Sequence, residues 1–145
     1  MPYDFEGWAT KNDLVCADGL TIKKDAFKVN DGKTVPLVWN HQHNKVSDVL
    51  GHAVLENRDE GVYAHCSFND TQAGRDAKKA VLHGDVTALS IWANNLHQVG
   101  MDILHGVIRE VSLVLAGANP GAFIESVLAH SEPIGEGEDE GIFYT

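Results

Sequence analysis

The sequence contains only two cysteines, Cys16 and Cys66, among 145 residues. Two thiols could form a single disulfide, but small secreted domains are typically held together by several bridges. The sequence therefore predicts two free thiols in a reducing compartment rather than a disulfide-stabilised fold.

Long apolar runs are also missing from the chain. No stretch approaches the roughly 20 apolar residues that a membrane-spanning helix needs. The N-terminal residues 1–13 lack the basic start and the apolar segment of a signal peptide. We therefore expect no membrane partner, and we expect the protein to stay in the cytosol where it is synthesised.

Basic residues are scarce, with 11 Lys and Arg against 21 Asp and Glu and a formal net charge of −10. Because such a surface repels phosphate groups, nucleic acid is not an expected partner. Five of the acids lie in 132–140, which contains no basic residue. That pattern predicts a flexible acidic tail over 131–145, following a single domain over 1–130.

The residues that are present predict a mainly β domain with helices, of the α+β class. Short apolar or alternating segments bounded by Gly, Asn and Asp are typical of strands, and a turn at 59–61 predicts a hairpin. Alanines and Val81 on one face predict a helix over 71–83, begun by Asp70 or Thr71 and ended by Gly84. A short helix or turn is possible after 118–121, and 123–129 fits either a helix or a strand. The predicted strands are 5–10, 34–40, 49–56, 61–68, 86–94 and 107–116.

Three polar side chains in apolar strands are candidates for chemistry. Ser90 in VTALSIWAN would share a strand face with Trp92, although serines that simply fit a sheet are common. His41 follows the apolar segment VPLVWN, where an imidazole can reach out of the core as a general base or make a structural hydrogen bond. Glu110 shares a face with apolar neighbours and therefore needs a specific partner. If Glu110 has a structural role, that partner is Arg109, Arg75 or a lysine in an ion pair. If Glu110 has a functional role, the partner is a ring nitrogen of His41.

Five segments, taken in order, resemble the prohead serine protease family of tailed phages. They are VPLVWNH at 35–41, YAHCSF at 63–68, DTQAGRDAKKAVLHG at 70–84, ALSI at 88–91 and REVSLVLAGANPGA at 109–122. Each segment is short, so the resemblance depends on their combination, which covers roughly residues 5–125.

The resemblance implies a compact antiparallel β-barrel similar to that of the herpesvirus assembly proteases, acting as a serine endopeptidase without a cofactor or metal. Ser90 would be the nucleophile, His41 its general base and Glu110 the third member of the triad. His105 competes for the third place, because the herpesvirus relatives use a second histidine there. Candidates for oxyanion stabilisation come from the 116–122 loop, namely Gly117, Asn119 and Gly121.

The resemblance also implies partners and a place of action. The substrates would be the major capsid protein with its scaffolding segment, any separate scaffold protein and the protease itself. Cleavage would occur inside the assembling prohead in the host cytoplasm, by a homodimer or higher oligomer if the herpesvirus relatives are a guide. Trp92 stands where the family commonly has glycine, so we expect Trp92 to line the substrate pocket and alter specificity.

Two other hypotheses come from different functional classes. His41 and His43 form an HxH pair that could bind a metal together with Asp48, His52 or His65, as in a metal-dependent hydrolase. Alternatively, the domain could be a capsid-assembly or scaffold module without catalytic activity. A chelator tests the first hypothesis, and Ser90→Ala tests the second.

Overall fold

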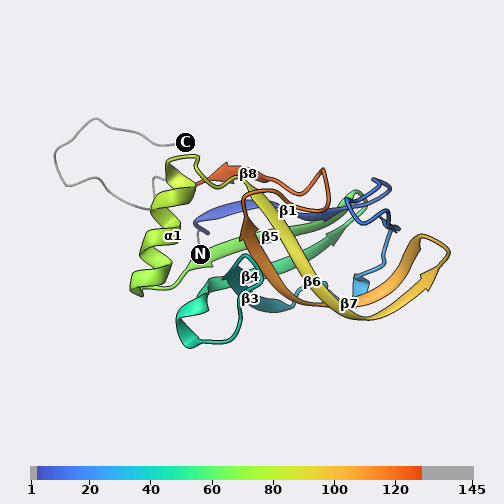
Figure 1. The fold of residues 1–145 in the computed structure, drawn as a ribbon, viewed down its shortest axis with the longest axis horizontal. Helices are drawn as coiled ribbons and strands as arrows, with labels where there is room; N and C mark the ends of the chain where they lie inside the picture. Colours follow the sequence, from blue (N-terminus) through green and yellow to red (C-terminus); the bar gives the residue numbers. More distant parts are fainter. Residues whose placement is uncertain (1–2, 129–145) are drawn as a thin grey trace.

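The computed structural model describes residues 3–128, so the predicted acidic tail at 131–145 lies outside the described residues. Within 3–128 the chain forms eight strands, one α-helix and two 3-10 turns (Figure 1). None of the helices in this part has the length and apolar character needed to cross a membrane. The elements are β1 (Phe5–Lys11), β2 (Thr21–Ile22), η1 (Lys28–Asn30), β3 (Thr34–Trp39), η2 (Val46–Asp48), β4 (Val49–Arg58), β5 (Gly61–Phe68), α1 (Gln72–Leu82), β6 (Ala88–Val99), β7 (Asp102–Val114) and β8 (Ile124–Val127).

One strongly curved sheet contains all eight described strands, in the order β2-β7-β3-β4-β5-β1-β8, with β6 paired to β7. Strand β6 pairs with β7 along nearly its whole length, whereas β3 and β2 pair with different parts of β7 in parallel. Strands β3 and β2 must therefore occupy the edge of β7 opposite β6. Strand β7 thus connects β3 to β6, which are far apart in the sequence.

The prediction of an α+β, mainly β fold is confirmed, but the predicted antiparallel barrel needs correction. Two pairings, β2 with β7 and β3 with β7, are parallel. The sheet is also not closed by a strand ladder. Between β6 and the segment leading into β8 there is only an isolated bridge, Ala88 with Phe123, and hydrogen bonds from Leu89 N to Ala122 O and from Ile124 N to Thr87 O.

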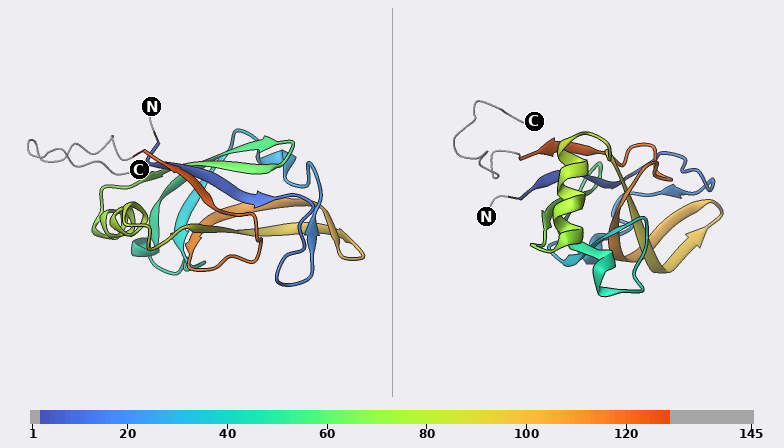
Figure 2. Two further views of the ribbon diagram at one scale, coloured as in Figure 1. Left: turned by 90° about the horizontal axis from the view of Figure 1, so that it is seen from above. Right: turned by 60° about the vertical axis from the view of Figure 1, so that its left-hand side comes forward.

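All six predicted strands are present, and β6 and β7 extend beyond their predicted limits. They continue as a hairpin that turns at Gly100, whose φ is +60°, and projects away from the end where α1 lies (Figures 1 and 2). The last five residues of β6 are exposed, so the hairpin lacks the apolar pattern by which a strand is predicted. In the ambiguous segment 123–129, residues 124–127 form the strand β8, and residue 129 lies outside the described residues.

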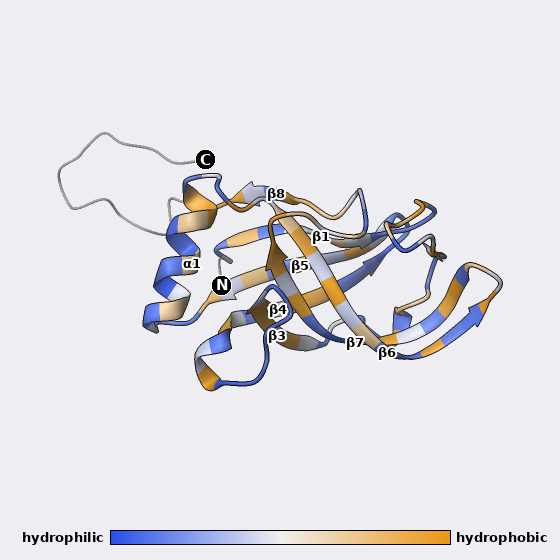
Figure 3. Cartoon of the chain, in the orientation of Figure 1, coloured by the Kyte–Doolittle hydropathy of each residue, from blue (hydrophilic) through white to orange (hydrophobic). Residues whose placement is uncertain are grey.

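The helix α1 confirms the predicted helix at 71–83, with an end one residue inside each predicted limit. The Thr71 side chain accepts a hydrogen bond from Gly74 N at 3.0 Å, which caps the N-terminus. Gly84 follows the helix with φ of +78°, a conformation that favours glycine. Ala73, Ala77 and Ala80 pack against the core, while hydrophilic residues interrupt the apolar ones along the helix (Figure 3).

The hydrophobic core fills the inside of the curved sheet. Burying each large aliphatic or aromatic side chain contributes about 1.5–3 kcal/mol relative to leaving it in water. The tight packing fixes the strands that carry the polar residues described next. The largest apolar side chains that are fully buried are Phe5, Leu37, Leu55, Leu89, Ile108 and Leu113.

Candidate active site

The register of β6 and β7 places four side chains together on one face of the sheet. Ser90 lies directly opposite Ser112, and Trp92 lies directly opposite Glu110. Directly opposed residues share a face, as do residues two apart in one strand. The pairing therefore gathers Ser90, Trp92, Glu110 and Ser112 on one side of the β6–β7 ladder.

A left-handed turn brings His41 to the same place. Strand β3 ends at Trp39, one residue earlier than predicted, and Asn40 N donates to Leu113 O at 2.9 Å. Asn40 and His41 then have φ values of +49° and +59°, and Gln42 N donates to Trp39 O at 2.9 Å. The turn, rather than strand alternation, directs the imidazole, and Asn and His tolerate this conformation better than most residues.

His41 lies between Ser90 and Glu110. Its Nε2 is 3.0 Å from Ser90 Oγ, and its Nδ1 is 2.9 Å from Glu110 Oε2. An ionised carboxylate can only accept hydrogen bonds, so His41 carries its proton on Nδ1. The lone pair on Nε2 is then free to accept the hydroxyl proton of Ser90, which is the arrangement that a general base requires.

Glu110 is buried, with 3% of its surface exposed, and its hydrogen-bond partners are two histidine rings and one serine hydroxyl. Besides His41, its Oε1 accepts from His43 Nδ1 at 2.8 Å, and its Oε2 lies 3.3 Å from Ser112 Oγ. The Ser112 oxygen also accepts from His41 N at 2.9 Å. These contacts satisfy the carboxylate and hold the backbone of His41 against β7.

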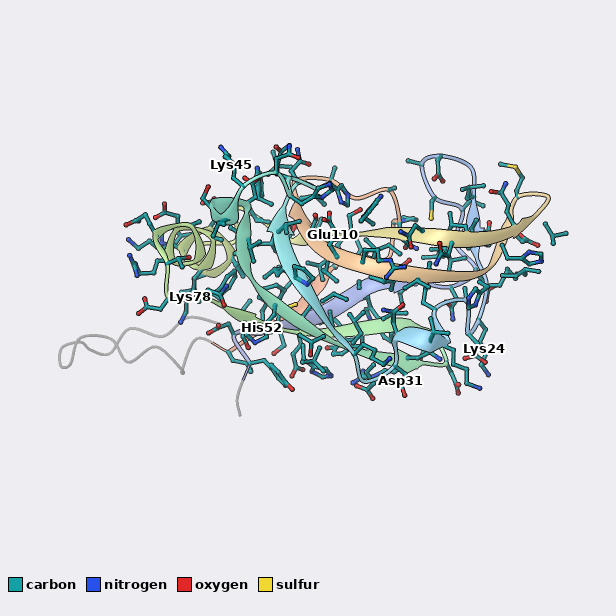
Figure 4. All side chains as sticks on the ribbon, turned by 90° about the horizontal axis from the view of Figure 1, so that it is seen from below. Lys24, Asp31, Lys45, His52, Lys78 and Glu110 are labelled. Carbon is teal, nitrogen blue, oxygen red and sulfur yellow. The ribbon has the colours of Figure 1, made fainter. Side chains whose placement is uncertain are left out.

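The structural ion pairs considered for Glu110 are not formed. Arg109 donates to Asn94 Oδ1 at 2.7 Å, and Arg75 forms an ion pair with Asp70. Figure 4 shows the labelled lysines Lys24, Lys45 and Lys78 away from Glu110. Of the alternatives left open by the sequence, the structure therefore brings Glu110 to the ring of His41.

The competing residue His105 is on β7 but points to a different location. It lies opposite His97 in the exposed part of the β6–β7 hairpin. Glu110 is five positions further along the strand, which is about 16 Å of extended chain. Glu110, and not His105, occupies the position next to His41.

Two residues of this cluster were not assigned to it by sequence analysis. Ser112 lies two residues after Glu110 in REVSLV, and strand alternation alone could have placed both on one face. His43 was considered only as a metal ligand, because its contact with Glu110 depends on the turn at 40–42. The HxH spacing identified His43 as a possible metal ligand, but it did not predict the hydrogen bond between His43 and Glu110.

The ligand set considered for a metal does not assemble. Asp48 accepts hydrogen bonds from Asn44 N and Lys45 N, and His65 contacts Glu6 and Glu56. Figure 4 shows His52 well separated from Glu110. Over residues 3–128, no group of three or more His, Cys, Asp and Glu side chains is arranged to hold a metal ion.

The loop after β7 lies next to Ser90. A Cβ on Gly117 would be 2.6 Å from Leu89 O, so the loop backbone passes close to β6. The Asn119 amide donates to Thr10 Oγ1 and Lys11 O and accepts from Gly121 N at 2.9 Å. The Asn119 side chain and the Gly121 N–H are therefore already used within the fold. In the described part of the chain, the N–H groups of 116–118 donate to no other residue.

A cavity of about 230 Å³ opens beside Ser90. Its walls are largely apolar, with Trp92 at one side and Asn119 of the loop at another. Trp92 is 45% exposed, so its indole is accessible from the cavity and from solvent. The remaining apolar wall includes Leu20, Ile22, Phe27, Ile91, Leu96 and Ile103.

Comparisons with known proteins concern the family and the fold of the chain. No curated protein matches the sequence. A crystal structure of KSHV protease in complex with a hexapeptide phosphonate inhibitor has a similar fold, with a TM-score of 0.61 and 13% sequence identity. The match covers 82% of this chain but only 62% of the KSHV protease chain. The model of the caudovirus prohead serine protease family matches residues 5–136, so the chain belongs to that family.

Proposed function

We propose that this chain is a serine endopeptidase that acts in the maturation of phage proheads. The observation that supports this most directly is the continuous hydrogen-bonded series from Ser90 Oγ through the His41 ring to Glu110 Oε2, at 3.0 and 2.9 Å. Membership of the prohead serine protease family agrees with it. In this proposal Ser90 is the nucleophile, His41 the general base and Glu110 the residue that orients and stabilises His41.

The reaction would begin when Ser90 Oγ attacks the carbonyl carbon of the scissile peptide bond. As the new C–O bond forms, the hydroxyl proton passes to His41 Nε2, and the carbonyl oxygen becomes an oxyanion. His41 then gives this proton to the leaving amine as the C–N bond breaks, which leaves an ester on Ser90. A water molecule hydrolyses that ester, with His41 again acting first as base and then as acid.

Glu110 would contribute in two ways. Its carboxylate accepts the hydrogen bond from His41 Nδ1, which keeps the proton of neutral His41 on Nδ1 and away from Nε2. Its negative charge stabilises the imidazolium that forms during attack. Because Glu110 is buried, its charge acts through a medium that screens less than bulk water. The series therefore provides both orientation and electrostatic stabilisation.

The loop after β7 is the proposed source of oxyanion stabilisation. The N–H groups of 116–118 are the candidates, with Gly117 next to β6 at the centre of this segment. Backbone N–H groups that wait for a developing negative charge stabilise the transition state without rearrangement, typically by about 3 kcal/mol for each donor. The side chain of Asn119 would fix the loop rather than contact the oxyanion, because its donors are already bound to β1.

The proposed substrates are the scaffolding segment of the capsid protein, any separate scaffold protein and the protease itself. The largely apolar cavity beside Ser90 would receive a substrate side chain, with Trp92 as part of its wall. The indole reduces the space near Ser90 compared with the glycine that the family commonly has there. We therefore propose that Trp92 contributes to the choice of cleaved bond.

The test is co-expression of the wild type and of Ser90→Ala with the cognate capsid protein, followed by mass spectrometry of the products. We expect defined capsid-protein fragments with the wild type and none with Ser90→Ala. Normal prohead maturation with Ser90→Ala would instead indicate an assembly module without catalysis. Activity that resists a serine-directed phosphonate but is lost with a chelator would indicate a metal-dependent hydrolase.

A further inference from the structure

His43 contacts the carboxylate oxygen of Glu110 that His41 does not contact. Its Nδ1 lies 2.8 Å from Glu110 Oε1, while His41 Nδ1 contacts the other oxygen, Oε2, at 2.9 Å. The Glu110 side chain is only 4% exposed, whereas that of His43 is 49% exposed. One buried carboxylate is therefore held between two imidazole rings, and one of these rings is at the surface.

The two oxygens of Glu110 differ in how many partners they have. Oε2 has two neighbouring donors, His41 Nδ1 and Ser112 Oγ. For Oε1, the His43 ring is the donor found within residues 3–128. The rotation of a carboxylate about its last bond has broad preferences, so hydrogen bonds must define its orientation. The position of Oε2 relative to His41 thus depends on the contact that His43 makes with Oε1.

The His43 ring also contacts the indole of Trp92. The two ring centroids are 5.3 Å apart and the planes are inclined by 36°. Trp92 is also the residue directly opposite Glu110 in the β6–β7 pairing. The indole and the carboxylate therefore hold His43 from two neighbouring strands, although the ring is half-exposed.

We propose that His43 is a positioning residue for the proposed triad: by holding Oε1 of Glu110, it keeps Oε2 directed at His41. This inference rests on the proposed function, which it extends to a residue outside the triad. His43 acts only through Glu110 and does not take the proton of Ser90. Its contribution comes from the Nδ1–H donor, and the contact of its ring with Trp92 serves to orient that donor.

Three substitutions separate the donor from the ring. His43→Asn places an amide N–H near the position of Nδ1 but removes the aromatic ring. His43→Phe retains a ring that can contact Trp92 but has no donor, and His43→Ala has neither. Removal of a partner that orients a functional side chain commonly reduces activity by about 10–100-fold. We expect kcat to fall about tenfold in His43→Phe and His43→Ala, with KM within about twofold of the wild type, and we expect His43→Asn to recover most of kcat.

The assay uses the full chain and a peptide that spans a cleavage site identified in the capsid protein, with thermal unfolding to confirm that each variant folds. Wild-type kcat in both His43→Phe and His43→Ala would overturn the proposal, as would an effect confined to KM. A kcat for His43→Asn as low as that of His43→Ala would show that donation from this position is not what matters.

A second measurement distinguishes failure of this inference from failure of the proposed function. The Nδ1–H proton of His41 can be followed by NMR in the wild type and in the three variants, whether or not the protein cleaves peptides. We expect faster exchange of this proton with water in His43→Phe and His43→Ala than in His43→Asn. Unchanged exchange in all three variants would overturn the inference. An inactive wild type with the expected exchange pattern would overturn only the peptidase assignment.

Discussion

Replacing Glu110 by glutamine separates the charge of the third member of the proposed triad from its shape. Glutamine has one acceptor oxygen and one NH₂ group where the carboxylate has two acceptors. The NH₂ group can face His43, whose half-exposed ring is free to carry its own proton on Nε2. The oxygen can then still accept from His41 Nδ1, so the tautomer of His41 is retained and the main loss is the negative charge.

The size of this loss follows from the distance between the groups. Glu110 Oε2 and His41 Nδ1 are 2.9 Å apart, which puts the carboxylate and imidazolium charge centres on the order of 4 Å apart. Two unit charges at that distance interact by about 4 kcal/mol at an effective dielectric constant of about 20, which corresponds to about 10³-fold in rate. Because the His41 side chain is 37% exposed, water screens part of this interaction. We therefore expect Glu110→Gln to react about 10²- to 10³-fold more slowly.

The rate of covalent labelling of Ser90 by a fluorophosphonate, followed by mass spectrometry, measures this effect without knowledge of the cleavage site. Glu125→Gln is the matched control, because Glu125 also accepts two donors, from Trp8 Nε1 and Tyr63 OH, at 2.8 and 2.9 Å. We expect the control to label at the wild-type rate. A Glu110→Gln rate within about threefold of the wild type would refute the electrostatic argument, and an equal loss in both variants would point to a general effect on the fold.

Three further predictions concern the turn, the buried serine and the alkaline limit of stability. In urea unfolding, Asn40→Gly should leave the unfolding midpoint near that of the wild type, whereas Asn40→Val should lower the free energy of unfolding by about 1–2 kcal/mol. The reason is the φ of Asn40, +49°, which glycine adopts readily and valine does not. Equal midpoints for both variants would contradict this prediction. Ser112→Ala should cost about 0.5–1.5 kcal/mol in the same measurement and should slow labelling, because the part-buried N–H of His41 loses its acceptor. Unchanged stability and rate would count against this prediction. Burial, and then the hydrogen bond to Glu125, raise the pKa of Tyr63 to about 12 from the ordinary 10. The folded state thus favours the neutral phenol. The contribution of Tyr63 to the free energy of unfolding should therefore be fully present below about pH 10 and should fall as pH rises towards 12. Tyr63→Phe should reduce that fall, and identical pH profiles for the two proteins would refute the assignment.

Strand positions were predictable wherever one face of a strand is buried. Strands β1, β3, β4 and β5 follow the alternating or apolar patterns that the sequence displays, and α1 follows its alanine face and its Thr71 cap. The outer half of the β6–β7 hairpin could not be predicted in this way. The last five residues of its β6 arm are exposed, and on its β7 arm Ile103 is buried beside exposed residues, so its order comes mainly from the cross-strand ladder and the turn at Gly100.

The triad members could be proposed from the sequence, but their contacts could not be derived from it. His41 and Ser90 are 49 residues apart, and His41 and Glu110 are 69 apart. Local patterns carry no information on the parallel pairing of β3 with β7, which brings His41 to Glu110. Resemblance to a family supplied the triad, whereas strand alternation supplied only the shared face of Ser90 and Trp92.

Strand β7 explains why three such distant segments meet at one point. Near its C-terminal end, the backbone of β7 pairs with β3 on one edge and with β6 on the other, so side chains in or next to this stretch are within reach of both. Ser112 lies in this stretch and Glu110 next to it: Ser112 accepts the backbone N–H of His41 and lies opposite Ser90. A shift of β6 by one residue would turn Ser90 to the other face of the sheet, because side chains alternate. The geometry on which the proposed reaction depends is therefore set by the same register that buries Leu89 and Leu113 in the core, so the packing that fixes this register also holds the site in place.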